Sequence, residues 1–433
     1  METTRHDLTP GWHYDEDTGA IMRDVIHRMG RRCFNWDYCG KGVYMVTMTL
    51  ADRSKPLFGR LVGESPETAA IELTELGRAV DAHLRRIGEF TPEIELLGAQ
   101  LMPEHLHAVL RVKRRMAKPL GIALRGFKGG ASQLFWRLSV PEETRQLLAE
   151  RTNADRKPLF AEGYVDNILG DEQAVESALR YLADNPRRLW EKCAHPELFK
   201  VLREVKLALR SASADSGQSH LLAVGTASAT PSAGGGHLLG DCSPSATAAP
   251  AVPTAGYFSA IGNLALLDAP NVFQVQCSRS FFEYRRAPDG SLLKDAPPAG
   301  ETREFIEKRD GFLEAAEHGA VLLSPCISHG EREIARLAFE KGLKVVTLAN
   351  KGFNPLYKPG GRLFDQCAGG NLLMLAPSPL PYVPGEKKMT RVDACVLNRI
   401  AQWLSGPGAV DIKYLGVEPR QVDRLAREAL KAE

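Results

Sequence analysis

The stretch Leu97–Val112, LGAQLMPEHLHAVLRV, carries the pattern that decides the fold of the first half of the chain. We predict that this stretch is a β-strand. Side chains alternate between the two faces of a strand, so His105 and His107 share one face and Leu106 points to the other. Two imidazoles on one face can hold a metal ion. A histidine pair of this kind can also be purely structural.

A second segment, Tyr181–Asn185 (YLADN), has helical character, and positions i and i+4 share one face of a helix. A tyrosine phenolate can attack a phosphodiester, but its pKa near 10 means that it needs help at neutral pH. Asn185 can add a carbonyl oxygen to two imidazoles, a ligand set that suits Mg²⁺ or Mn²⁺. The alternatives are a packing role for Tyr181 and a helix-end role for Asn185, because Pro186 follows it.

The patterns around these two segments predict an α+β domain with an antiparallel sheet. A further strand is expected at Gly42–Leu50, which alternates and is rich in β-branched residues. Helices are expected at Pro66–Ile87, Pro119–Leu138 and Asp171–Asp184.

Residues 211–256 are dominated by Ser, Ala, Gly, Thr and Pro and contain no Lys or Arg. Such a segment buries too little apolar surface to order itself, so we predict a flexible linker. A chain of 433 residues is long for one core, and the linker divides it into domains at 1–210 and 257–433.

The second half has a different rhythm, in which short apolar strands alternate with helices. This alternation predicts βαβ units, a parallel sheet and a Rossmann-like domain. Strands are expected at Asn271–Gln276, Ala320–Leu323, Lys344–Leu348 and Asn371–Leu375. Helices are expected at Arg303–His318, Glu331–Lys341 and Val392–Leu404.

A basic band follows the histidine pair: eight Lys or Arg and no Asp or Glu lie between Arg111 and Arg137. It is either a solvated charged face or a track for a phosphate backbone. The overall net charge of +2 does not decide between these readings.

The eight cysteines form no CxxC pair, which favours reduced thiols. The start of the chain lacks the pattern of a signal peptide, and no apolar run approaches the roughly 20 residues that span a bilayer. We therefore expect a cytoplasmic protein with no membrane contact.

Three ordered motifs in the first half resemble those of the single-tyrosine HUH transposases, and most closely the REP-associated tyrosine transposase branch. They are Met102–His107 (MPEHLH), Leu124–Lys128 (LRGFK) and Tyr181–Arg188 (YLADNPRR). The segments Val46–Thr49 and Lys157–Phe160 extend the likeness. The classical members carry Gln where this chain has Asn185, and Asn fits the REP-associated branch.

The resemblance implies an HUH nuclease domain in which His105, His107 and Asn185 bind the metal and Tyr181 is the nucleophile. That family acts on single-stranded DNA beside hairpins. Some relatives build each site from two subunits, so both a monomer and a homodimer remain open. The basic residues expected to contact DNA are Arg114, Arg115, Arg125, Lys128, Arg187 and Arg188.

The second half resembles, more weakly, the DprA/Smf DNA-processing family. Its landmarks are Gln276–Arg279, Ser324–Gly330, Ala349–Tyr357 and Asn398 with Arg399. The pattern departs from the family at Cys277, where Gly is usual, and a GxGxxG motif is absent from the sequence. Nucleotide binding, DNA binding, protein docking and a structural role all stay open for this half.

The leading expectation is a metal-dependent single-strand DNA endonuclease and strand transferase that forms a 5′-phosphotyrosine intermediate. The alternative is a non-catalytic single-stranded DNA-binding or recombination accessory protein. A metal hydrolase of small phosphoesters would need a carboxylate-rich site, and only Glu104 and Asp184 lie near the motifs in sequence.

Overall fold

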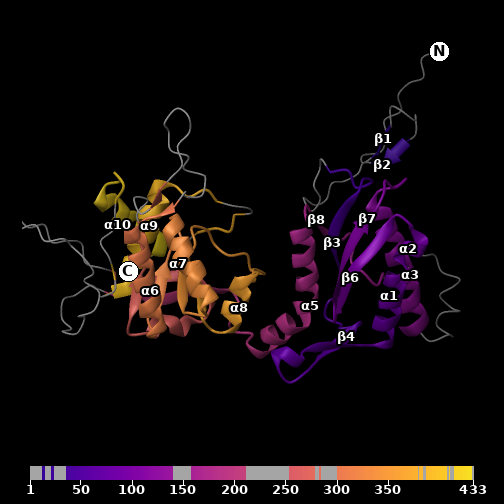
Figure 1. Cartoon of the computed structure of the whole chain (residues 1–433), viewed down its shortest axis with the longest axis horizontal. Helices are drawn as coiled ribbons and strands as arrows, with labels where there is room; N and C mark the ends of the chain where they lie inside the picture. The colour runs from indigo at the N-terminus through magenta and orange to yellow at the C-terminus, as the bar shows by residue number, and fades with distance from the viewer. Residues whose placement is uncertain are drawn as a thin grey trace, which may run out of the picture. The chain divides into compact units, whose positions relative to one another are not determined.

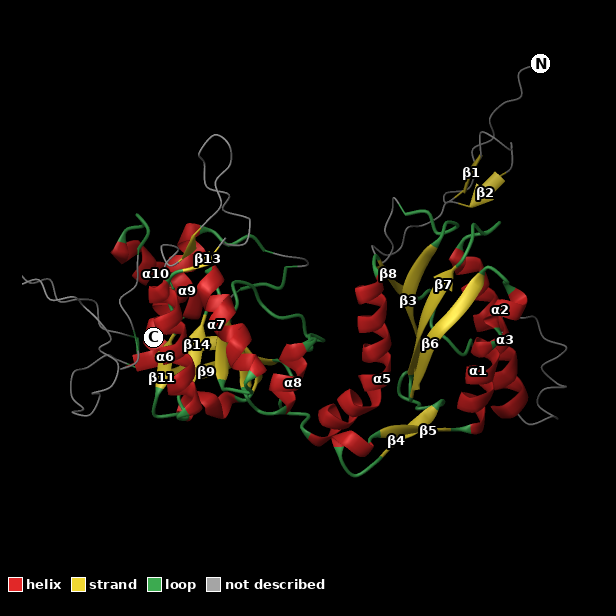
Figure 2. Cartoon of the chain, viewed as in Figure 1, coloured by secondary structure: helices red, strands yellow, loops and turns green. Residues whose placement is uncertain are grey.

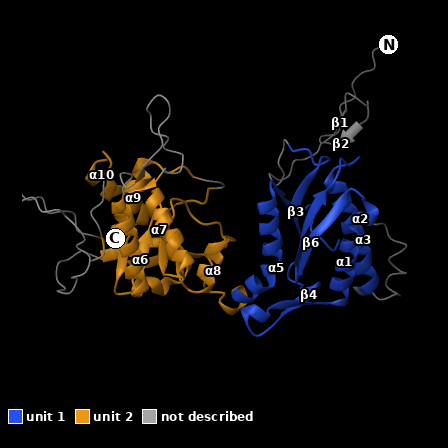
Figure 3. Cartoon of the chain, in the orientation of Figure 1, with its two compact units in different colours: residues 1–191 blue, residues 192–433 orange. Residues whose placement is uncertain are grey.

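The structure is a computed structural model, and the chain forms two compact units, Met1–Glu191 and Lys192–Glu433 (Figure 3). It describes residues 12–14, 21–23, 36–139, 158–210, 253–277, 282–283, 300–378, 380–383, 387–406, 409 and 414–431. Among these residues, no helix is long and apolar enough to cross a membrane.

The first unit is built on a four-stranded antiparallel sheet in the order β6-β7-β3-β8. These strands are β3 (Gly42–Thr49), β6 (Ile94–Met102), β7 (His105–Val112) and β8 (Val165–Leu169). The helices are α1 (Glu75–Arg85), α2 (Ile87–Phe90), α3 (Leu120–Ser139) and α5 (Glu172–Ala194). Two small antiparallel pairs join β1 (Trp12–Tyr14) to β2 (Ile21–Arg23) and β4 (Gly59–Val62) to β5 (Ala70–Leu73). The expected antiparallel sheet with helices is confirmed.

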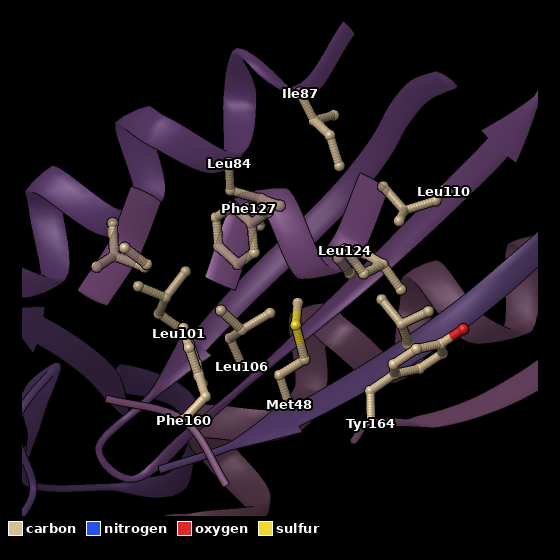
Figure 4. Close-up of a cluster of buried hydrophobic side chains, with 14 of the residues drawn as sticks. Met48, Leu84, Ile87, Leu101, Leu106, Leu110, Leu124, Phe127, Phe160 and Tyr164 are labelled. Atoms are coloured by element: carbon tan, nitrogen blue, oxygen red, sulfur yellow. The ribbon is translucent and has the colours of Figure 1, made fainter. Parts of the chain in front are cut away.

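Helices cover both faces of this sheet: α1 and α3 lie on one face and α5 on the other (Figures 1 and 2). On the first face, Met48, Leu106 and Leu110 from the sheet pack with Leu84 and Leu124 from the helices in one buried cluster (Figure 4). On the second face, a smaller cluster joins the sheet to α5. The first face is therefore apolar, whereas on the α5 face the strand β7 carries His105, His107 and Arg111 around the buried Val109.

The predicted single strand Leu97–Val112 is wrong: the stretch is a hairpin, with β6 ending at Met102 and β7 beginning at His105. The two residues between them are Pro103 and Glu104. Proline has no N–H to give to a ladder and favours the first inner position of a turn. The alternation that follows is as expected, because Leu106 is buried on the α1 and α3 face.

The predicted helix Pro66–Ile87 begins too early. A short 3₁₀ turn, η1 (Pro66–Thr68), leads into β5, and α1 starts only after Thr74, whose hydroxyl caps it by accepting from the N–H of Gly77. Residues 69–73 have helical spacing, but they form a strand because β5 pairs with β4. This pairing is a tertiary effect, which local periodicity cannot predict.

The predicted helix Asp171–Asp184 ends too early. The helix α5 runs from Glu172 through Pro186 to Ala194. Proline inside a helix removes one backbone hydrogen bond, here to the carbonyl of Leu182. Both Leu182 and Pro186 are buried, so packing against the sheet stabilises the helix across the interruption.

The second unit contains a six-stranded mixed sheet in the order β11-β14-β15-β16-β10-β9. The first four strands are parallel, whereas β10 pairs antiparallel with both β16 and β9. The parallel part agrees with the prediction from sequence, and the two antiparallel strands were not predicted. The strands are β9 (Leu202–Ala208), β10 (Ala255–Gly262), β11 (Val272–Gln274), β14 (Val321–Ser324), β15 (Val345–Leu348) and β16 (Leu372–Pro377), with β12 (Phe282–Glu283) and β13 (Gly300–Glu301) forming a separate pair.

Helices also cover both faces of the second sheet: α6 and α7 pack on one face, and α9 and α10 on the other. All four residues of β14 are buried, as expected of a strand covered on both sides. The helices are α6 (Arg303–Glu317), α7 (His329–Glu340), α8 (Arg362–Ala368), α9 (Arg391–Ser405) and α10 (Pro419–Leu430), with a 3₁₀ turn η3 (Leu264–Asp268).

The segment between the units differs in detail from the expected division of the chain. The strand β9, which precedes the expected boundary at residue 210, pairs with β10 in the second sheet. The strand β10 begins at Ala255, inside the segment 211–256 predicted as a linker. The rest of that prediction, residues 211–252, lies outside the described residues.

Candidate active site

The strand β7 places the two histidines on the face of the first sheet that α5 covers. His107 lies opposite Thr47 of β3 and Gln100 of β6, whereas Leu106 is fully buried on the other face. The Nε2 atoms of His105 and His107 are 3.1 Å apart, and their rings meet edge to face. His107 is 6% exposed, whereas the side chain of His105 is 19% exposed and so remains partly open to solvent.

An oxygen atom lies beside the Nδ1 atom of each ring. The hydroxyl of Thr47 is 2.8 Å from Nδ1 of His107, and a carboxylate oxygen of Glu104 is 3.2 Å from Nδ1 of His105. The same contact with His105 lowers the pKa of Glu104, despite its partial burial. An imidazole that carries its proton on Nδ1 has its Nε2 lone pair available to a metal ion.

The spacing of the two Nε2 atoms fits ligation of one small divalent ion. Two ligand atoms about 2.1 Å from an ion, at right angles to each other, lie about 3.0 Å apart. Among the described residues, no three His, Cys, Asp or Glu side chains gather around a common point. A complete coordination shell at His105 and His107 would therefore need an amide, water or substrate oxygen.

The helix α5 brings Tyr181 to this pair. The ring centroids of Tyr181 and His107 are 5.6 Å apart, and the planes are nearly perpendicular. The guanidinium of Arg188 lies 5.5 Å from the centroid of the Tyr181 ring, close enough for a cation–π contact. Tyr181 and Arg188 are seven residues apart, two helical turns, so they share one face of α5.

Close approach of α5 to the sheet depends on Gly98 of β6. A Cβ atom at this position would lie 2.6 Å from the side chain of Leu179 and 3.7 Å from that of Leu182. Both leucines belong to the cluster that holds α5 on the sheet, next to Tyr181. The bare backbone at Gly98 thus sets the distance between the helix and the histidine strand.

Asn185 is 7% exposed and lies one turn after Tyr181. Its Nδ2 donates a hydrogen bond to the backbone carbonyl of Tyr181 at 3.0 Å. With Nδ2 held by the helix, Oδ1 is the atom that could serve as a metal ligand. The prediction that Asn185 is the third ligand stays a prediction.

The basic residues expected to contact DNA fall into distinct settings. Arg187 makes a two-pronged ion pair with Asp184, and Arg188 lies 3.9 Å from the same carboxylate. Lys128 donates to the backbone carbonyls of Ala161 and Gly163, and burial lowers its pKa. Its ammonium therefore holds a neighbouring loop.

The other three lie elsewhere on the unit. Arg114 and Arg115 follow the far end of β7, roughly 23 Å along the strand from His105 at about 3.3 Å per residue. They pair with Glu93 and Asp37 respectively. Arg125 is exposed on α3. The basic band is thus partly neutralised by carboxylates that are distant in sequence.

Sequence reasoning missed Thr47 and gave Glu104 no role beside His105. Thr47 meets His107 only through the pairing of β3 with β7, which requires the sheet order. Glu104 precedes His105 directly, and a carboxylate adjacent to a ligand histidine is a signal that could have indicated its role.

Comparisons with known proteins give distant likenesses. No protein-family profile matches the chain. An uncharacterized protein of Haemophilus influenzae is 25% identical over 173 residues, which are 39% of this chain and 92% of that protein. The structure of a REP-associated tyrosine transposase bound to a REP hairpin covers 36% of this chain and 72% of its own, at 13% identity and a TM-score of 0.24.

A second structure, a crystal structure described as that of a putative transposase from Deinococcus radiodurans, covers 35% of this chain and 95% of its own. It is 15% identical, with a TM-score of 0.21. About a third of the chain therefore has a partial likeness to two transposase structures. At these scores neither match establishes an activity for this chain.

Proposed function

We propose that the first unit is a metal-dependent single-strand DNA endonuclease and strand transferase with Tyr181 as its nucleophile. The observation that carries the proposal is the convergence of the Nε2 atoms of His105 and His107, 3.1 Å apart, beside the ring of Tyr181. One strand and one helix, far apart in sequence, supply these groups. Two imidazoles and a phenol around one point suit phosphodiester cleavage better than a packing role.

The reaction is an in-line displacement at phosphorus. The phenol of Tyr181 loses its proton, its oxygen forms a bond to the phosphorus, and the bond from phosphorus to the 3′ oxygen breaks. The 3′ oxygen takes up a proton and leaves as a hydroxyl, and the 5′ phosphate stays on the tyrosine. The reverse displacement by a new 3′-hydroxyl rejoins a strand, so transfer needs no external energy source.

The residues that would hold the metal are His105, His107 and Asn185, with Mg²⁺ or Mn²⁺ as the expected ion. A bound divalent cation supplies polarisation of the scissile phosphate and neutralises charge that develops there. Thr47 and Glu104 orient the two imidazoles through their Nδ1 atoms. The guanidinium of Arg188 lies 5.5 Å from the centroid of the Tyr181 ring, on the same face of α5.

The proposed substrate is single-stranded DNA that contains a hairpin. This rests on the resemblance of the three motifs to REP-associated tyrosine transposases. We also propose that the first unit is an HUH nuclease domain. The second unit would then be a Rossmann-like domain related to DprA/Smf proteins. The parallel strands β11, β14, β15 and β16 support the second assignment.

A covalent adduct tests the proposal. Incubation of the full chain with end-labelled hairpin-containing single strands and Mg²⁺ or Mn²⁺ is expected to give a protein–DNA band on a denaturing gel. Tyr181→Phe should lower this band by about a thousandfold or more, as deletion of a nucleophile does in other enzymes. The matched control is Tyr257→Phe, in the second unit, which should leave the band unchanged. An undiminished adduct in Tyr181→Phe would reject the assignment.

One observation favours the alternative, a non-catalytic single-stranded DNA-binding or accessory protein. The amide of Asn185 is engaged with its own helix, and the described residues offer no third acidic or histidine ligand. His105→Ala separates the two functions. The proposed enzyme loses its adduct while it still binds DNA, whereas a binding protein shows no adduct before or after the substitution.

A further inference from the structure

A cavity of about 690 Å³ lies in the layer of α1, α2 and α3, on the opposite face of the first sheet from the histidine pair. Its walls come from His83 of α1, Phe90 of α2, Phe127 of α3 and the loop that contains Lys118. Its volume falls in the range of cavities that bind small organic groups. The proposed chemistry at Tyr181 does not use it.

Aromatic rings form much of the wall. His83 and Phe127 stack with centroids 5.2 Å apart and planes at 17°, and Phe90 lies beside His83 at 5.8 Å. Burial lowers the pKa of His83, so its ring is neutral at neutral pH. Phe90 is 63% exposed, so much of its ring is accessible at the rim of the cavity. Phe127 is buried, so the exposed ring of Phe90 and the half-buried ring of His83 are the surfaces on which a flat ligand could stack.

One glycine of α3, Gly126, borders the cavity without filling it. Glycine is unfavourable inside a helix, so each one needs a reason. A Cβ at Gly130 would lie 2.3 Å from Nε2 of His83, so packing accounts for that glycine. A Cβ at Gly126 would meet no atom within 4 Å, and Gly126 lines the cavity. The missing side chain at Gly126 leaves room that the protein itself does not fill.

Polar and charged groups surround this apolar surface. Lys118 lines the cavity and is exposed, and the guanidinium of Arg86 lies 5.6 Å from the centre of the Phe90 ring. Glu93 also lines the cavity and contacts Arg114 at 3.4 Å. Cations at the mouth of an aromatic cavity complement a ligand with a flat ring and a phosphate. An unpaired nucleotide has both.

We propose that this cavity binds one unpaired base of the single-stranded DNA, at a position several nucleotides from the scissile phosphate. The inference rests on the proposed function for its substrate and deepens it by assigning a second contact point. The base stacks beside Phe90 and His83, and its phosphate lies near Lys118. The two sites lie on opposite faces of one sheet, so the strand passes around the sheet edge between them.

Gly126→Leu tests the proposal, because Gly126 lines the cavity and a Cβ atom there meets no atom within 4 Å. Binding of short fluorescein-labelled single strands of dA, dC and dT to the full chain is measured by anisotropy. We expect Gly126→Leu to weaken the tightest of them about tenfold, equivalent to about 1.4 kcal/mol. Gly129→Leu is the matched control: it lies on the same helix, outside the cavity, and its Cβ also meets no atom within 4 Å. Equal affinity of the two variants would overturn the proposal.

Two further measurements keep this proposal separate from the proposed chemistry. Gly126→Leu should still form the Tyr181 adduct when DNA is saturating, and both leucine variants should melt no lower than the parent chain, since leucine favours a helix. Replacing single nucleotides by abasic sites should reveal one position whose loss matters to the parent chain and not to Gly126→Leu. If no position behaves so, the cavity does not hold a base. An absent adduct in the parent chain would reject the nuclease and leave this binding result intact.

Discussion

At the scale of residues, the candidate site depends on what holds each imidazole. Thr47 and Glu104 occupy the Nδ1 side of His107 and His105, so both Nε2 atoms face the same point. Neither residue would touch the phosphate. Their contribution is to orient the imidazoles. Removal of such partners commonly lowers metal affinity by roughly ten- to a hundredfold.

We therefore predict that Glu104→Gln and Thr47→Val each weaken Mn²⁺ binding by about tenfold or more. Titration calorimetry on the full chain without DNA measures this directly and does not depend on activity. The control is Glu95→Gln on the same hairpin, because Glu95 pairs only with exposed Arg111. Unchanged Mn²⁺ affinity in both test variants would show that the oxygens beside Nδ1 play no part in ligation.

At the scale of elements, α5 carries the nucleophile and β7 carries the histidines, and their separation is set where α5 crosses β6. A Cβ atom at Gly98 would lie 2.6 Å from Cδ2 of Leu179, so the Leu179 side chain would have to shift. Overpacking of this kind costs about 1–3 kcal/mol. It would also move Tyr181 relative to His107.

Gly98→Val is accordingly expected to lower both the melting temperature, by several degrees, and the yield of the tyrosine adduct. Gly170→Val is the matched control, because a Cβ at Gly170 meets no atom within 4 Å. Calorimetric melting and the gel assay report the two effects. A Gly98→Val protein with full adduct yield would show that the packing of α5 against β6 does not position Tyr181.

These elements also show which parts of the fold can be predicted from local sequence. The alternation at His105–Val112, the helix at residues 120–139 and the four parallel strands were predictable, because each element repeats its own period. The turn at Pro103 and the passage of α5 through Pro186 were not, because the first looks like more strand and the second like a stop. Packing decides both.

At the scale of the whole molecule, the first unit ends inside α5 and the second begins before β9. The strand β9 belongs to the second sheet, where it pairs with β10. A boundary drawn at residue 210 therefore separates β9 from its partner. The boundary was predicted from the composition of the low-complexity segment. Composition carries no information on the pairing of β9 with β10.

A fragment of residues 1–194 should consequently associate with itself less than a fragment of residues 1–210. The longer fragment carries β9 with its backbone N–H and C=O groups unpaired, a template for association between chains. Size-exclusion chromatography with light scattering compares the two fragments at equal concentration. If both fragments elute as monodisperse monomers, unpaired β9 does not cause association between chains, and the prediction is wrong.

The pairing of arginines with carboxylates around residues 111–115 has a consequence for how this unit would respond to ionic strength. Arg111, Arg114 and Arg115 each contact an acidic side chain in the folded protein. A phosphate that replaced one of those acids would exchange one anionic partner for another and change the local charge little. Fewer counterions would then be released than the density of basic residues suggests, and the affinity for nucleic acid would fall only gently as salt rises.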